Sequence, residues 1–222
     1  MAQLFPRGSN AFVRICIVAV LLLVGTAVTL VINTNRLPYV TDVGMTKEQP
    51  VPFSHKHHVT GIGIDCRYCH TSVEESSFAN IPPVHTCMTC HSQIWTESPL
   101  LEPIRESYRT GKAIEWVRIH DLPDFVYFNH SIHIHKGIGC ESCHGRVDQM
   151  PLMRKVNTLN MEWCLACHRA PEKFVRPRSE VFNMAWKPVD KDGHPISQDV
   201  LGARLVKEYD IKTSTDCSTC HR

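Results

Sequence analysis

The chain has 222 residues and a formal net charge of +2, with 43% hydrophobic but only 8% aromatic residues. This nearly balanced charge argues against a nucleic-acid partner, and the length allows one or two domains. Because part of the hydrophobic fraction lies in one N-terminal run, the remainder is sparse for a core made of side chains alone. We therefore expect large apolar cofactors to fill the interior, and the chain without them to be largely unfolded.

The N-terminal run, residues 15–32, carries no charge and is long enough to span a bilayer as one helix. Arg7 and Arg14 precede it, so the positive-inside rule predicts a cytoplasmic N-terminus. Arg36, just beyond the run, weakens this asymmetry. The run predicts a single-pass anchor in a bacterial inner membrane.

The domain boundary is expected where this anchor ends. We predict a cytoplasmic tip and transmembrane anchor over residues 1–36 and a periplasmic domain over residues 37–222. The alternative is a cleaved signal peptide, but the run exceeds the usual apolar length of such peptides and no clear Ala-x-Ala site follows it. The interpretation as an anchor is therefore preferred.

The pattern Cys-x-x-Cys-His occurs five times in the exported part of the chain. It is the signature of covalent haem c attachment, in which the cysteines form thioethers with the porphyrin and the histidine becomes the proximal iron ligand. Zinc sites would not require a histidine after every second cysteine, and disulfides would not require the fixed gap. We predict five covalently bound haem c groups. The segments are motif 1 (Cys66, Cys69, His70), motif 2 (Cys87, Cys90, His91), motif 3 (Cys140, Cys143, His144), motif 4 (Cys164, Cys167, His168) and motif 5 (Cys217, Cys220, His221).

A second pattern, Phe-x-His-x-x-His, occurs twice, each time ahead of two motifs. The repeat units are residues 53–91 and 128–168, which indicates a duplicated two-haem unit. Histidines three residues apart project from one face of a helical turn and can reach two different irons. We predict that these histidines are distal iron ligands: His55, His58, His130 and His133.

Five irons need a fifth distal ligand. His120, in the segment just before the second unit, is the preferred candidate. Met150 or Met161 is the alternative, and a methionine would raise the reduction potential of that haem relative to a bis-histidine site.

Three shorter elements complete the expected fold, which is mostly α-helical and irregular, with little regular secondary structure. Residues 103–109 predict a short helix closed by Gly111, and residues 199–209 predict an amphipathic helix with Leu201, Leu205 and Tyr209 on one stripe. Residues 169–178 are basic and interrupted by proline. We interpret them as a solvated strap, and a strap lying against a partner or haem propionates is the alternative.

The repeated Phe-x-His-x-x-His ahead of Cys-x-x-Cys-His resembles the class III cytochromes c. By this resemblance, His55 would ligate the haem of motif 1 and His130 the haem of motif 3. His58 and His133 would each ligate a different haem. The resemblance thus assigns roles to all four histidines of the repeated pattern.

More of the chain resembles the pentahaem subunit of bacterial alternative complex III. The similar features are the N-terminal apolar helix, the five motifs, His-Asp-Leu-Pro-Asp-Phe-Val-Tyr at 120–127, Met-Glu-Trp at 161–163 and the terminal Cys-Ser-Thr-Cys-His-Arg. The resemblance implies a quinol-oxidising membrane complex of a respiratory chain that delivers electrons to a periplasmic cytochrome c, a copper protein or an oxidase. It implies as partners an iron-sulfur subunit, quinol-binding integral membrane subunits and a monohaem cytochrome c.

The leading hypothesis is therefore an electron-transfer subunit with no catalytic residues of its own. A multihaem oxidoreductase is the first alternative, but it needs an iron with an open position, and spare histidines suffice to close every iron. A self-standing, membrane-anchored quinol dehydrogenase is the second alternative. It would oxidise quinol without any other subunit.

Overall fold

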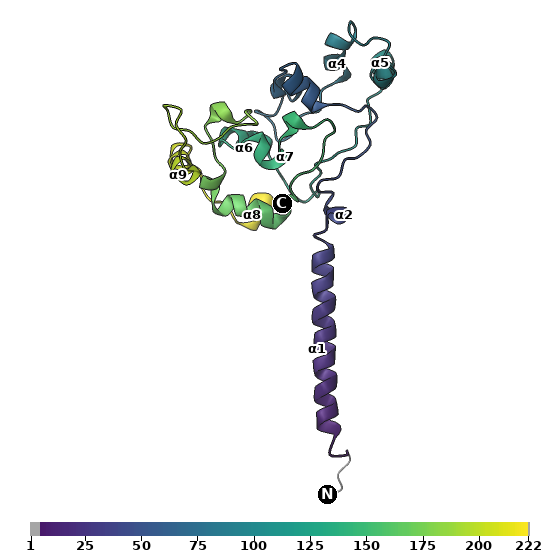
Figure 1. The fold of residues 1–222 in the computed structure, drawn as a ribbon, viewed down its shortest axis with the longest axis vertical. Coiled ribbons are helices and arrows are strands. Elements are labelled where there is room, and N and C mark those ends of the chain that lie inside the picture. Colours follow the sequence, from purple (N-terminus) through teal and green to yellow (C-terminus); the bar gives the residue numbers. More distant parts are fainter. Residues whose placement is uncertain (1–4, 222) are drawn as a thin grey trace. The chain divides into compact units, whose positions relative to one another are not determined.

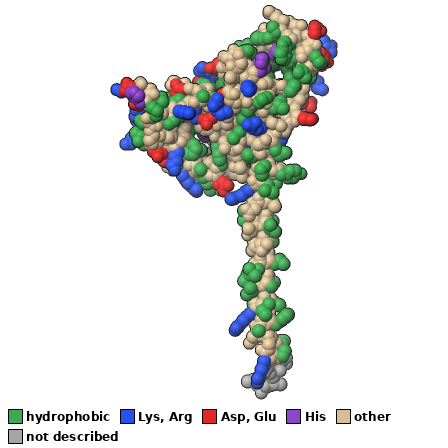
Figure 2. Space-filling view, in the orientation of Figure 1, with side chains coloured by type: hydrophobic (Ala, Val, Ile, Leu, Met, Phe, Trp, Pro, Cys, Tyr) green, Lys and Arg blue, Asp and Glu red, His purple; other side chains and the backbone are tan. Residues whose placement is uncertain are grey.

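The computed structural model describes residues 5–221, and the chain divides into two units, Met1–Asp42 and Val43–Arg222. The first unit contains helix α1 (Ser9–Thr34) and the short helix α2 (Pro38–Thr41) (Figure 1). Within the described residues α1 is the one helix long and apolar enough to span a membrane, and none of its residues is buried in the protein. Figure 2 shows hydrophobic side chains along its length. The predicted apolar helix over residues 15–32 is present.

The second unit consists of short helices joined by irregular segments (Figure 1). Among its described residues, extended pairing is limited to isolated bridges, so the predicted fold class is confirmed. The α-helices are α3 (Cys66–Cys69), α4 (Val84–His91), α5 (Glu102–Thr110), α6 (His130–His135), α7 (Cys140–His144), α8 (Met161–Arg169), α9 (Gln198–Glu208) and α10 (Cys217–Cys220). The turns are the π-helical η1 (Lys56–Gly61) and the 3-10 helices η2 (Pro99–Leu101), η3 (Val147–Gln149), η4 (Pro171–Lys173) and η5 (Arg178–Glu180).

Buried hydrophobic side chains of this unit form three small clusters rather than one continuous core. Each cluster also contacts partly buried neighbours, and a motif cysteine packs against two of them, Cys87 in one case and Cys140 in the other. The side-chain core therefore adjoins the motifs, as expected for an interior that large cofactors complete. The clusters are Val175, Leu201, Leu205 and Tyr209; Val51, Leu101 and Ile104; and Val73, Ile134 and Val181.

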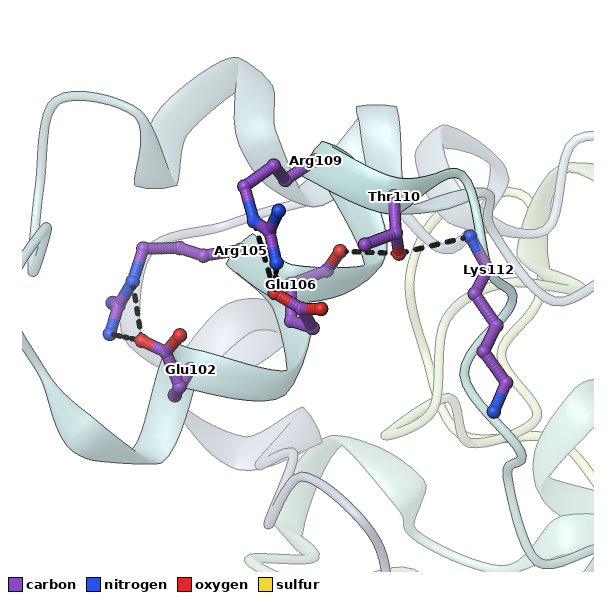
Figure 3. A network of polar contacts seen from close by, with 6 residues as sticks. All are labelled: Glu102, Arg105, Glu106, Arg109, Thr110 and Lys112. Atoms are coloured by element: carbon purple, nitrogen blue, oxygen red, sulfur yellow. Dashed lines mark hydrogen bonds and ion pairs between the residues drawn. The ribbon is translucent and has the colours of Figure 1, made fainter.

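Helix α5 forms within one residue of its predicted bounds. Proline stands in its first turn, and the chain leaves the helix at Gly111, whose φ of 74° lies in the left-handed region that glycine adopts without strain. Ile104 is buried and helps α5 pack against α4. Figure 3 shows the opposite, polar side, where two Arg–Glu pairs at i, i+3 spacing lie near the surface; such pairs contribute about 0.2–0.5 kcal/mol each.

The prediction of a solvated strap over residues 169–178 is wrong for its middle, although Arg169, Lys173 and Arg178 are exposed. The turn η4 packs against α9. Val175 is fully buried there, and Arg176 is only 5% exposed. The Arg176 guanidinium donates to Glu141 at 2.6 Å and lies over the Trp186 ring at 4.9 Å. Charge runs are usually solvated, but here an ion pair and an aromatic face replace water around the buried cation.

The α9 prediction is confirmed, and its packing allows a stability test. An ideal Cβ added at Gly202 would lie 1.8 Å from the backbone oxygen of Glu172, which cannot move without displacing η4. We expect Gly202→Ala to lower the free energy of unfolding by about 3 kcal/mol or more, because overpacking against backbone has no cheap relief. Thermal or denaturant unfolding of the purified protein measures the loss. Val200→Ala, at a 61% exposed position of the same helix, is the control and should change little.

Candidate functional site

Each Cys-x-x-Cys-His motif lies on or at the end of a helical turn. In motif 1 the backbone N–H of His70 donates to the carbonyl of Cys66 at 2.9 Å, and in motif 5 His221 makes the same bond to Cys217. One turn of helix therefore brings both thiols and the imidazole of each motif to neighbouring positions. None of the described cysteines forms a disulfide, so the thiols are available for thioethers.

The two Phe-x-His-x-x-His segments have nearly the same internal geometry. The Phe53 ring lies edge-on to His55, with ring centroids 4.9 Å apart at 87°, and stacks on His58 at 4.4 Å and 23°. The sequence repeat is thus a structural repeat, although His55 precedes the π-helical turn η1 and the second pair lies in α6. The corresponding values are 4.8 Å and 89° for Phe128 with His130, and 4.5 Å and 29° for Phe128 with His133.

Three of the motif histidines face a histidine of these segments at a characteristic separation. A metal–nitrogen bond is about 2.0 Å long, and the ring centre lies about 1.1 Å beyond the nitrogen. Two imidazole centroids on opposite sides of one metal are therefore about 6.2 Å apart. The structure contains three pairs with this spacing. They are His58 with His91 (6.3 Å, 66°), His130 with His144 (6.4 Å, 6°) and His133 with His168 (6.2 Å, 64°).

Backbone carbonyls orient most of these rings. A ligating histidine usually donates its other ring N–H to such an acceptor, which fixes the tautomer and leaves Nε2 for the metal. The Nδ1–carbonyl contacts are His58 with Ser54 (2.8 Å), His70 with Asn80 (2.7 Å), His91 with Ile94 (3.3 Å), His130 with Ser77 (2.8 Å), His133 with Asn129 (2.7 Å), His168 with Ser214 (2.8 Å) and His221 with Phe125 (3.1 Å).

Burial keeps the candidate ligands uncharged. It lowers the pKa of His144 to about 3 and the pKa of His55 to about 4, so both imidazoles are neutral at pH 7 and have a free lone pair. It also lowers the pKa of His58 and His133. This environment suits metal ligation, since a protonated imidazole cannot bind iron.

His55 stands apart from its counterpart in the second repeat. Its Nδ1 is buried and has no hydrogen-bond partner among the described residues, whereas His130 Nδ1 contacts Ser77 O. Its pKa is lowered chiefly by burial and secondarily by His70 and His58, which places His70 in its surroundings. The structure thus brings His55 near the histidine of motif 1.

His120 lies beside motif 3 rather than beside motif 5. Its ring is 4.4 Å from that of His144 at 77°, too close for two ligands on opposite sides of one metal. His120 Nε2 is nevertheless buried and has no hydrogen-bond partner in the described part of the chain. The aromatic neighbour of His221 is Phe125, at 5.6 Å.

The two methionine alternatives differ in exposure. Met150 is only 3% exposed, and its carbonyl accepts a hydrogen bond from the N–H of Lys56, the first residue of η1. Met161 is 67% exposed in the first turn of α8, which carries motif 4. Of the two thioethers, only that of Met161 is open to a further group.

Comparison with known proteins identifies the chain. Residues 126–222 match the model of cytochrome c7 and related cytochrome c. The chain is also 35% identical over 184 residues to a protein of Nitratidesulfovibrio vulgaris named menaquinone reductase, multiheme cytochrome c subunit, covering 79% of this chain and 78% of that one. The chain is a multihaem cytochrome c. Covalent haem c is therefore its cofactor, and the motif cysteines fit the attachment of that group.

Sequence reasoning missed one part of the candidate sites in this cytochrome. The carbonyls of Ser77, Asn80 and Ser214, which orient His130, His70 and His168, come from loops outside the motifs. A backbone carbonyl has no residue signature, so no sequence pattern could have located these acceptors.

Proposed function

We propose that this cytochrome is the electron-transfer subunit of a membrane-bound quinone oxidoreductase complex and holds five haems. The observation that carries the proposal is the set of three imidazole pairs at 6.2–6.4 Å. A histidine on each side of an iron leaves no open position for a substrate, which favours electron transfer over catalysis at the iron.

The assignment of ligands follows the geometry and the repeat. His58, His130 and His133 serve motifs 2, 3 and 4, and His55 serves motif 1 by analogy with His130. Each Phe-x-His-x-x-His segment thus spans two haems, as the resemblance to class III cytochromes c implies. His120 remains the proposed fifth distal ligand because its buried Nε2 has no partner among the described residues, although its ring lies beside motif 3. Met161, which is more exposed than Met150, is the alternative.

The protein's part in electron transfer is to hold each site still. When bound, haem c supplies an iron that gains and loses one electron. The two cysteines of each motif fix the group covalently, and the carbonyl contacts at Nδ1 prevent the ligating imidazoles from rotating. Burial of His55, His144 and Cys143 reduces water at the inner sites. Rigid ligands and limited solvent keep the rearrangement that accompanies each transfer small.

Helix α1 and the comparison support the proposed assembly. The helix is proposed as a retained membrane anchor with the haem domain on the periplasmic side, since haem c is attached outside the cytoplasm. The relative's name places it in a menaquinone reductase. The partners proposed for this chain are quinol-binding integral membrane subunits, an iron-sulfur subunit and a monohaem cytochrome c, as in a complex similar to alternative complex III.

The direction of electron flow has two candidates. Quinol oxidation toward a periplasmic acceptor is the direction implied by the resemblance to alternative complex III. Menaquinone reduction is favoured by the name of the relative. The same haem sites can carry electrons in either direction. The reduction potentials of the quinone and of the periplasmic partner therefore decide the direction. Adding quinol or a reduced periplasmic cytochrome to the purified complex, and following haem absorbance, distinguishes the two.

Purification from native membranes tests the function. The haem absorbance should co-migrate with iron-sulfur and quinol-binding subunits, mass spectrometry should show five haems on this chain, and the oxidised protein should give low-spin EPR signals alone. A high-spin haem that turns over a small substrate would support the multihaem oxidoreductase instead. Recovery of the chain alone, still reduced by quinol, would make it a self-standing quinol dehydrogenase.

The fifth ligand can be tested by a pair of substitutions. His120→Ala is expected to convert one low-spin haem to a high-spin form that binds carbon monoxide, because buried Nε2 has no protein partner and is free for iron. Met161→Leu is the matched control and should leave every haem six-coordinate. The opposite pattern would assign Met161 to the fifth haem and leave His120 as a packing neighbour of His144.

A further inference from the structure

We propose that the five motifs form one unbranched row in the order 2, 1, 3, 4, 5, which departs from their order in the sequence. The row rests on the proposed function, since it assumes that each motif holds a haem. Motifs 2 and 5 are its ends, and motifs 1, 3 and 4 are its interior. Electrons would therefore enter at one of these ends and leave at the other.

Motifs 1 and 2 are neighbours through the residues between their cysteines. Tyr68 of motif 1 and Thr89 of motif 2 are joined by a hydrogen bond of 3.0 Å between their hydroxyl oxygens. On its other side, motif 2 is covered by α5, because Cys87 and Met88 pack against the cluster containing Leu101 and Ile104. The side of motif 2 that faces away from motif 1 therefore contacts side chains and not another motif.

Motif 1 is also the neighbour of motif 3. The loop after motif 1 orients the histidine that faces motif 3, since Ser77 O contacts His130 Nδ1 at 2.8 Å. Cys140 packs against the cluster that contains Val73, which follows motif 1 by three residues. The turns beside the two motifs are joined as well, because Thr60 donates to the carbonyl of Asp148 at 2.6 Å.

Motifs 3 and 4 share helix α6, which presents one histidine to each of them. The Asn157 amide, from the segment leading to motif 4, donates to the carbonyls of Ser142 and Cys143 at 3.1 and 3.0 Å. Two independent connections therefore join these motifs.

Motif 5 follows motif 4 at the end of the row. His168 Nδ1 contacts the carbonyl of Ser214, just before motif 5, at 2.8 Å. Among the described residues, the backbone of motif 5 makes one other long-range hydrogen bond, which Tyr127 N donates to Cys220 O at 2.9 Å. Tyr127 belongs to the exposed segment before α6.

The row explains the duplication. Motifs 1 and 3 occupy equivalent places in the two repeat units, and so do motifs 2 and 4. The units are joined through their first motifs, so their second motifs point outward along the row in opposite directions. Motif 5 then extends the second unit by one place.

Removing single haems from the purified complex distinguishes this row from the order of the sequence. The haem of motif 1 is removed by Cys66→Ala with Cys69→Ala, and that of motif 2 by Cys87→Ala with Cys90→Ala. Each remaining haem is followed by EPR-monitored redox titration, because the charge of one haem shifts the potential of its direct neighbours. We expect loss of haem 1 to shift two of the four remaining potentials and loss of haem 2 to shift one.

The sequential order 1, 2, 3, 4, 5 predicts the reverse, and that result would overturn the row. Mass spectrometry checks the haem number first: fewer than five haems on the unaltered chain would contradict the proposed function, whereas five haems with the reversed pattern would contradict only the order. Should a variant fail to fold, His55→Met and His58→Met retain all haems and change the potential of haem 1 or haem 2. We then expect His55→Met to shift the potentials of two neighbouring haems and His58→Met to shift the potential of one.

Discussion

Replacing the ten motif cysteines by alanine is expected to unfold residues 43–222 almost completely while leaving α1 helical in detergent. The described buried hydrophobic side chains of this unit are few and lie in three separate clusters. Small domains of this kind depend on a bound group to complete their interior, and here the covalent haems would supply the missing apolar surface. Loss of the thioethers removes that surface from the folded state.

Limited proteolysis and hydrogen exchange of the full chain in detergent measure this unfolding. We expect rapid cleavage and little protection across the second unit, with protection retained in α1. Cys16→Ala is the control, because Cys16 is exposed on α1 and belongs to no motif. A haem-free chain with protected α5 and α9 would show that side-chain packing alone suffices.

The sequence predicts the regular elements well because each has a local cause. The apolar run forms α1, proline and Gly111 delimit α5, and the stripe containing Leu201 and Leu205 is buried on α9. The strap of residues 169–178 could not be predicted in this way. Burial of Arg176 depends on Glu141 and Trp186, which lie in other segments of the chain.

In the candidate sites, too, local features could be predicted from the sequence and contacts between distant segments could not. Motif spacing fixes which residues of one helical turn lie together, so the cysteines and proximal histidines follow from sequence. The pairing of His58 with His91 and of His133 with His168 depends on tertiary structure. The resemblance to class III cytochromes c implies only that His58 and His133 each ligate a different haem. The position of His120 could not be predicted from the sequence. Its ring lies beside His144 rather than His221, which depends on how two distant segments fold together.

His133→Ala is expected to open one iron in five, at motif 4, and to give a high-spin haem that binds carbon monoxide. The reason is the ring pair: His133 faces His168 at 6.2 Å, and its Nδ1 contact with Asn129 O directs the other nitrogen away from the backbone. His135→Ala is the matched control on the same helix, since His135 is exposed and should leave all haems low-spin. Optical titration with carbon monoxide and EPR measure both.

A conservative variant separates ligation from packing in this prediction. His133→Met is expected to stay low-spin and bind no carbon monoxide, but to raise the potential of that haem by on the order of 0.1 V, within the span of about 0.8 V that axial ligands set. If His133 only packed against Phe128, neither substitution would change the spin state of any haem, and the pairing of α6 with motifs 3 and 4 would have to be abandoned. A loss of low-spin signal in His133→Ala, restored in His133→Met, requires the imidazole to be bound to iron, because only a coordinated side chain can be replaced in function by a thioether.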